Sequence, residues 1–466
     1  MVEILILLLS MLILVSSAYL YRIASGEAIW RLNMLNYSFY ILWVFSFIAS
    51  IVIVLDVPFL GFDPQEISHI YGDFNNRLHV WGMVMWMFIG IPLGAIAVNI
   101  SFSRSSGISR KMEIFRSSRF DIGWNYTDRS LYRIVFIASV LLVLLFIITM
   151  PKETPLFHVL GGGGVVEAQI IRRNFSFGFE NALLKSLFNT GTLMLLSLIA
   201  FIMSLRTGHL KWWILFVAQF LVMAFLSILS GIIGHILFYL VSLAFCRTMI
   251  GGRFLKLYEF ILGCLLVPGL FFLFKGAAGS LWDILTNTVF FRFLSHLVGT
   301  YYSLQVFPSL HDFLWFSSSG HWINEVLTGT SSESYGIIMM NFYDPAGVAA
   351  GHAGHLTSIF LAEAWANFGI FGIIIAPLWV GSFVQLVNRF FVKRTKSVIS
   401  VALYTYLATT FGYSSDFVGF YYPAGTILFI LGAFIILFLP KLLMTRIVMN
   451  KTNINSTPTY NSAMSG

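Results

Sequence analysis

The sequence predicts an all-α protein that crosses a membrane many times. Of its 466 residues, 58% are hydrophobic and only 10% are charged, whereas soluble domains carry about 25% charged residues. The mean hydropathy is +0.85, and long apolar runs recur along the chain. Its two cysteines, Cys246 and Cys264, lie in or beside such runs and support neither a disulfide framework nor a metal site. We therefore predict a polytopic membrane protein with about 11 transmembrane helices.

The predicted spans follow from apolar runs of roughly 18 or more residues. The first run could be mistaken for a signal peptide. It is long, however, and the extreme N-terminus carries Glu3 and no Lys or Arg, so we interpret it as a retained span. Leu229-Ser230-Gly231 predicts a tight hairpin between two spans; a single kinked helix is the alternative and would reverse every later span. The spans are 2–21, 35–57, 79–100, 131–150, 186–205, 212–229, 231–247, 257–275, 356–384, 398–415 and 424–442.

Charge sorting predicts the orientation of these spans. With the N-terminus outside and the C-terminus in the cytoplasm, 21 of the 28 Lys and Arg residues fall inside and 15 of the 20 acids fall outside, as the positive-inside rule requires. Residues 1–449 then form a single membrane domain with outer loops at 151–184 and 276–355. The polar tail 450–466 is expected to be disordered. The basic inner loop 101–133 suits anionic membrane lipids and needs no nucleic-acid partner.

Paired arginines stand out among the few cations left outside. Arg172 and Arg173 follow four glycines at 161–164, and Val165–Phe179 could form a short interfacial helix. Two guanidinium groups suit a pyrophosphate, because each donates a planar, bidentate fork. Contact with lipid headgroups, or ion pairs with Glu167 or Glu180, is the alternative. The outer cations are Arg77, Lys152, Arg172, Arg173, Lys185, Lys275 and Arg292.

Arg292 lies in an amphipathic pattern early in the large outer loop. Apolar residues recur there at spacings of three and four, which predicts one face of a helix, and Arg292 falls on another face with Thr288 and His296. A helix lying on the membrane surface would direct Arg292 along the interface. An ordinary interfacial helix with a solvated arginine is the alternative. The apolar face comprises Trp282, Leu285, Val289, Phe293 and Leu297.

The large loop ends on two histidines and leads to a buried acid. His352 and His355 lack an H-E-x-x-H pattern, so we predict no metal site and consider them as proton acceptors. Glu363 is expected about two turns into the span 356–384, where an ionisable group should face a cavity or a partner. A helix running through His355, Glu363 and Asn367 would place them on similar faces. A structural glutamate bonded between helices is the alternative.

The segment from Ser358 to Gly372, SIFLAEAWANFGIFG, resembles the Glu-containing helix that follows the large outer loop in Wzy-type O-antigen and exopolysaccharide polymerases. The span-rich architecture, with an arginine-bearing outer loop early and a large outer loop late, is also similar to that family. The chain lacks the paired arginine–glycine loop motifs described for some members. His355 resembles a histidine that precedes the corresponding span in the related O-antigen ligases.

The resemblance implies a GT-C-like membrane glycosyltransferase in the bacterial inner membrane. It would use no cofactor and would join oligosaccharide repeat units carried on undecaprenyl pyrophosphate, at the outer face. Pathway partners such as a flippase and a chain-length regulator would accompany it. A ligase and, outside the enzymes, a lipid-linked glycan flippase are the alternatives.

Residue roles follow from that chemistry. Cations must stabilise the leaving pyrophosphate: Arg172, Arg173 and Arg292 are the first candidates, with Arg77 behind them. The acceptor hydroxyl needs a base: Glu363 or His355, then His352. Asn367 would contact the glycan, and outer-loop aromatic rings could stack on sugars, although anchoring at the membrane interface is the alternative. These rings are Tyr301, Tyr302, Trp315 and Trp322.

Overall fold

The structure, a computed structural model, is predominantly helical over the residues that it describes. Within them, the one strand-like pairing is an isolated bridge between Asp121 and Ser397. Seven helices are long and apolar enough to cross a membrane, so the chain is an all-α, multi-pass membrane protein. The described residues are 2–57, 71–102, 107–118, 120–123, 126–163, 165–174, 190–230, 233–251, 295–318, 334–351, 355–413 and 416–438.

Most of the predicted spans correspond to an observed helix. Three further apolar stretches of helix are shorter, namely Ile236–Gly251 within α13 (Ile233–Gly251), α23 (Val398–Thr410) and the helix at 424–438. The predicted span 257–275 and the tail 450–466 lie outside the described residues. The long helices are α1 (Val2–Ser25), α2 (Met34–Leu42) continued through the π-turn η1 (Trp43–Phe47) into α3 (Ile48–Leu55), α5 (Phe74–Phe102), α7 (Asp128–Thr149), α11 (Thr190–Thr207), α12 (Leu210–Ser230) and α22 (Ile370–Val392).

The predicted hairpin between the sixth and seventh spans is confirmed. Phe220 of α12 and Tyr239 of α13 have ring centroids 5.7 Å apart. In one continuous helix, the rise per residue would separate these two positions by roughly 28 Å. The Tyr239 hydroxyl also hydrogen-bonds Ser197 of α11. The chain therefore reverses between α12 and α13, and the kinked-helix alternative is excluded.

The prediction of one continuous span at 356–384 is wrong. The chain is extended up to Ile359, forms the nine-residue helix α21 (Phe360–Phe368), breaks at Gly369 and continues as α22. Gly369 has φ +57°, a conformation that glycine tolerates. A Cβ on Gly372 would overlap the backbone of Ala364, so α21 folds back against the start of α22. His355 consequently precedes the helix, and Glu363 lies in its first turn rather than two turns into a span.

Glycines allow α5 and α22 to pack backbone against backbone at the centre of the bundle. A Cβ on Gly94 would overlap the carbonyl group of Leu378, and one on Gly381 would overlap that of Ile91. Gly90 also lies close to α22, where an added Cβ would be 2.7 Å from the Pro377 ring. Gly90 and Gly94 form a G-x-x-x-G pattern, a sequence signal typical of close helix pairs in membranes.

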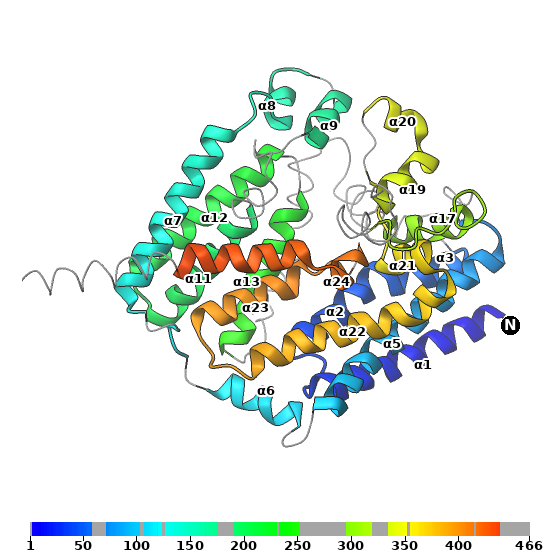
Figure 1. Cartoon of the computed structure of the whole chain (residues 1–466), viewed down its shortest axis with the longest axis horizontal. Coiled ribbons are helices and arrows are strands. Elements are labelled where there is room, and N and C mark those ends of the chain that lie inside the picture. Colours follow the sequence, from blue (N-terminus) through cyan, green and yellow to red (C-terminus); the bar gives the residue numbers. More distant parts are fainter. Residues whose placement is uncertain are drawn as a thin grey trace, which may run out of the picture.

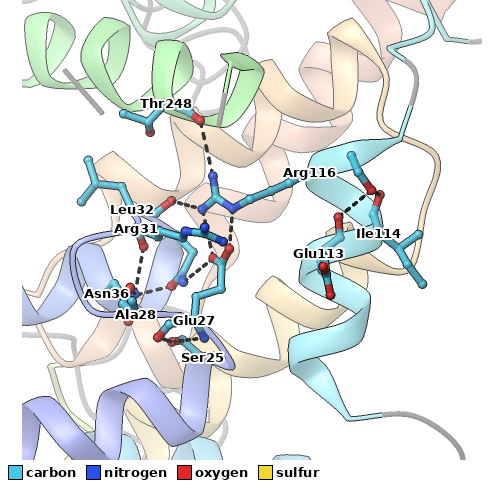
Figure 2. A network of polar contacts seen from close by, with 12 residues as sticks. Ser25, Glu27, Ala28, Arg31, Leu32, Asn36, Glu113, Ile114, Arg116 and Thr248 are labelled. Atoms are coloured by element: carbon cyan, nitrogen blue, oxygen red, sulfur yellow. Dashed lines mark hydrogen bonds and ion pairs between the residues drawn. The ribbon is translucent and has the colours of Figure 1, made fainter. Parts of the chain in front are cut away.

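The segments predicted to be cytoplasmic meet at one end of the bundle, which we call the predicted inner end. Glu27, after α1, is buried and pairs with Arg116 of α6 (Ile108–Ser117), as Figure 2 shows. Arg116 also donates to the carbonyl groups of Leu32 (2.9 Å) and, in α13, Thr248 (3.4 Å). Lys396 donates to the Arg116 carbonyl at 2.9 Å. These bonds join segments that the charge map places on one side.

Short helices gather at the opposite end, which we call the predicted outer end. Figure 1 shows α8, α9, α19 and α20 along the upper edge of the molecule and α6 at the lower edge. The helix expected after the four glycines is observed as α9, and Gly162 turns the chain before it with φ +84°. The short helices are α8 (Pro155–Leu160), α9 (Val165–Asn174), α17 (Val298–Val306), α19 (Tyr335–Tyr343), α20 (Pro345–Ala349) and α24 (Val418–Tyr421).

Candidate functional site

Helix α17 lies between two polar clusters at the predicted outer end. On one side it packs against the start of α5, and on the other against α21 and α19. Its first turn rests on the extended chain before α21, where the Gly299 amide donates to the Thr357 carbonyl at 3.1 Å. Any side chain at Gly299 would collide with that carbonyl. The 276–355 loop is thereby attached to the membrane helices through α17.

Local capping fixes Arg77 in the first cluster. The Asp73 side chain accepts a hydrogen bond from the Asn76 amide at 2.9 Å, which begins α5. Arg77 follows in the first turn and pairs with Asp56 at 3.0 Å. Asp56 ends α3 in the left-handed conformation, with φ 56°. Two helix ends thus hold one guanidinium group, whose side chain keeps 18% of its surface exposed.

Two buried tyrosines complete this first cluster, which we call the arginine–tyrosine cluster (Arg77, Tyr71 and Tyr301). Their ring centroids are 4.8 Å apart, and both residues are almost fully buried. Arg77 is close enough to lower the pKa of Tyr301 in part, although burial and Tyr71 together raise it well above the ordinary value. Among the described residues, neither tyrosine hydroxyl nor the Arg77 Nε atom has a hydrogen-bond partner.

Unpartnered buried polar groups of this kind are rare and costly. Each such group costs about 1–3 kcal/mol relative to a bonded one. Three such groups belong to this cluster, namely the two tyrosine hydroxyls and the Nε atom of Arg77. Arg77 is the least buried of the three residues and stays partly accessible to solvent. Tyrosine hydroxyls and a guanidinium group are hydrogen-bond donors of the kind that a multi-oxygen anion accepts from.

Glu363 centres the second cluster. Its side chain is 3% exposed, and its Oε2 atom accepts hydrogen bonds from the amides of Phe417 (2.5 Å) and Val418 (2.9 Å). Helix α21 has nine residues and is not one of the spanning helices. Burial raises the pKa of the Glu363 carboxyl to about 7, with a further contribution from Asp416 and opposition from the Val418 amide. The carboxyl group therefore titrates near neutral pH while it ties α21 to the start of α24.

Asn367 lies one turn beyond Glu363 and is fully buried. Its amide nitrogen donates to the Glu363 carbonyl at 2.8 Å, and its oxygen accepts from the Phe316 amide at 3.0 Å. Ser318 contacts the same side chain. These bonds hold the 314–318 turn against α21, so Asn367 positions the outer loop and offers no free surface to a glycan in this arrangement.

Of the other predicted site residues, Trp315 lies in the turn beside Asn367, where its backbone amide donates to the Asn367 carbonyl at 3.2 Å. His355 is exposed on the extended chain before α21 and packs against Gly336. Tyr302 is half-buried, and its hydroxyl donates to the Phe342 carbonyl at 2.8 Å. Trp315 is 60% exposed, and Arg172 is exposed on α9. Residues outside the described part are Arg292, His352 and Trp322, together with the side chain of Arg173.

Among the described residues, the structure brings together two pairs of predicted site residues from different segments, Arg77 with Tyr301 and Trp315 with Asn367. No group of three or more His, Cys, Asp or Glu residues within the described part is arranged to hold a metal ion. No protein-family model, curated protein or solved structure matches the chain. Fold and composition define the class, an all-α multi-pass membrane protein, and the function is argued from the site alone.

Proposed function

We propose that the chain is a membrane glycosyltransferase of the Wzy type. It would have eleven spans in a GT-C-like arrangement, with the clusters at the outer face of the bacterial inner membrane and the C-terminus in the cytoplasm. It would join undecaprenyl-pyrophosphate-linked repeat units into a polysaccharide. The observation that carries the proposal is the arginine–tyrosine cluster, whose buried hydroxyls and Arg77 Nε have no partners within the described residues.

The leaving group explains why such a cluster would be needed. The acceptor hydroxyl attacks the anomeric carbon of the donor sugar, and the bond from that carbon to the pyrophosphate oxygen breaks. The departing pyrophosphate takes the electron pair and gains negative charge. Donors fixed in advance around that charge stabilise the transition state. Arg77, Tyr71 and Tyr301 offer such donors, and their positions are set by α3, α5 and α17.

The acceptor must lose a proton as its oxygen forms the new bond. Glu363 suits this step because a carboxyl pKa of about 7 lies near the working pH, where a general base is most effective. Its Oε2 atom is occupied by two backbone amides, which fix the orientation of the carboxyl group. Access to the carboxyl would require the α24 segment to move, because only 3% of Glu363 is exposed.

A ligase is the second candidate, and the position of His355 favours it. The imidazole lies exposed before α21 rather than inside a span, where a proton acceptor could reach a soluble or lipid-bound acceptor. Both enzymes would use the same donor, so the arginine–tyrosine cluster does not discriminate between them.

Deletion of the gene in its host tests the proposal and separates the candidates. If the protein is a polymerase, we expect lipid-linked single repeat units and no long polymer. Long chains that remain on undecaprenyl pyrophosphate would identify a ligase, and repeat units retained on the cytoplasmic face would identify a flippase. Unchanged surface and lipid-linked glycans would contradict all three functions.

A further inference from the structure

A cavity of about 370 Å³ opens at the predicted inner end, where α22 ends beside the end of α5. Its apolar side chains are well exposed, at 45% for Leu386, 52% for Phe390 and 58% for Phe102. Its polar side chains are all cationic. The lining residues are Phe102, Leu386, Arg389, Phe390, Lys393 and Arg394.

Arg389 lines this cavity and is held in place by burial and hydrogen bonds. The residue is 3% exposed, and its Nη1 atom donates to the Asn99 side-chain oxygen at 3.0 Å. Its Nη2 atom donates to the Phe102 carbonyl at 3.1 Å. The same Asn99 oxygen accepts from Gln385 at 2.8 Å. All these partners are neutral, so the guanidinium is held in place while its charge is not compensated, which is costly for a buried cation.

Further cations surround Arg389. Lys393 and Arg394 follow it at the end of α22, and the Arg394 guanidinium lies 4.4 Å from the ring centre of Phe390. Lys111 of α6 faces the same place: burial, then repulsion from Arg389 and Lys393, lowers its pKa. Throughout the described part of the chain, none of these four cations forms an ion pair.

We propose that this cavity binds the phosphate headgroup of one anionic phospholipid. The cations converge at the end of α22, while Leu386, Phe390 and Phe102 continue along the helix shafts as exposed apolar surface. A phospholipid matches both parts, because its phosphate meets the cations and its acyl chains cover the apolar side chains. Free phosphate would match the cations alone. Basic pockets between helix ends are a known form of headgroup site, and this proposal does not depend on the proposed function.

The test compares two double variants with the same change in charge. Lys393→Gln with Arg394→Gln removes the exposed cations of the cavity and leaves Arg389 in the core. Arg129→Gln with Arg206→Gln removes two exposed cations from other segments at the predicted inner end. Purified full-length protein is exchanged into nanodiscs of phosphatidylcholine containing phosphatidylglycerol, and native mass spectrometry counts the retained phosphatidylglycerol.

We expect the cavity variant to bind phosphatidylglycerol roughly thirtyfold more weakly than the wild type, from about 1 kcal/mol for each cation. The control pair should retain nearly wild-type binding. Equal losses in both pairs would mean a diffuse charge effect and would overturn the proposal. Displacement of phosphatidylglycerol by inorganic phosphate at equal concentration would overturn the lipid assignment, because the apolar wall would then contribute nothing.

Discussion

At the scale of single residues, the proposed function depends most on Arg77. Replacing Arg77 by Ala should lower the rate of glycan transfer by roughly 10²–10³-fold, the usual cost of losing one donor to a developing oxyanion. Its partly exposed pair with Asp56 should contribute at most about 1 kcal/mol to folding. Polymer yield in membranes, normalised to protein level, provides the measurement.

Two companion variants separate catalysis from packing at this position. Lys152→Ala removes another predicted outer cation, which is exposed, and should leave the rate unchanged. Tyr301→Phe removes only a hydroxyl that has no partner in the described part of the chain. It should reduce transfer without lowering stability. Wild-type polymer from both Arg77→Ala and Tyr301→Phe would refute the pyrophosphate assignment of the cluster.

Glu363 makes a prediction about pH. Because burial raises the pKa of its carboxyl from 4.5 to about 7, the basic form gains population as the pH rises from 6 to 8. Transfer should therefore increase across this range in the wild type. Glu363→Gln keeps an acceptor oxygen for the Phe417 and Val418 amides, so it should fold and lose activity. A fully active Gln variant would reduce Glu363 to its structural bond with α24.

The raised pKa of Glu363 also predicts that the stability of the folded protein falls as the pH rises, whereas its activity increases. The folded state retains a proton that the unfolded chain releases above its ordinary pKa, so the contribution of Glu363 to stability falls as the pH rises from about 4.5 through 7. The Gln variant lacks this dependence. The melting temperatures of the wild type and the Gln variant should therefore differ least at acidic pH and most at neutral pH.

At the scale of helices, the α5–α22 contact makes the sharpest prediction. Gly94→Ala places a Cβ into the backbone of Leu378 and should cost about 1–3 kcal/mol through overpacking. Gly82→Ala, in the same helix with nothing within 4 Å of the added Cβ, should stabilise α5 by about 0.5–1 kcal/mol. Melting temperatures in detergent measure both. Equal effects would mean that α5 and α22 do not pack through Gly94.

Hydropathy located the helices well where polar residues mark both ends of an apolar run. The Leu229-Ser230-Gly231 hairpin could be inferred because its three residues interrupt two apolar runs. The break at Gly369 could not, since 356–384 is apolar on both sides of it and only the positive φ shows the reversal. Hydropathy also does not register the close approach of Gly90 and Gly94 to α22, although their spacing was visible in the sequence.

At the scale of the whole molecule, the charge map anticipated which loops meet. Glu27, Arg116, Thr248 and Lys396 come from four segments assigned to one side, and the other three all bond to Arg116. Composition could not show which outer residues converge. Arg77 and Tyr301 are far apart in sequence, and they meet only because α17 packs against α5. The sequence placed Arg77 behind the other arginines, whereas the structure places it, alone among the described candidates, beside two buried tyrosines without hydrogen-bond partners.

The central claim is that this protein joins lipid-linked glycan units. The direct test incorporates the purified protein into liposomes and supplies the lipid-linked glycan extracted from a host strain that lacks the gene. Gel electrophoresis should then reveal glycans longer than one repeat unit, together with released undecaprenyl pyrophosphate, and the Arg77→Ala protein should produce neither. A folded wild-type protein that leaves the supplied glycan unchanged in length would contradict the account.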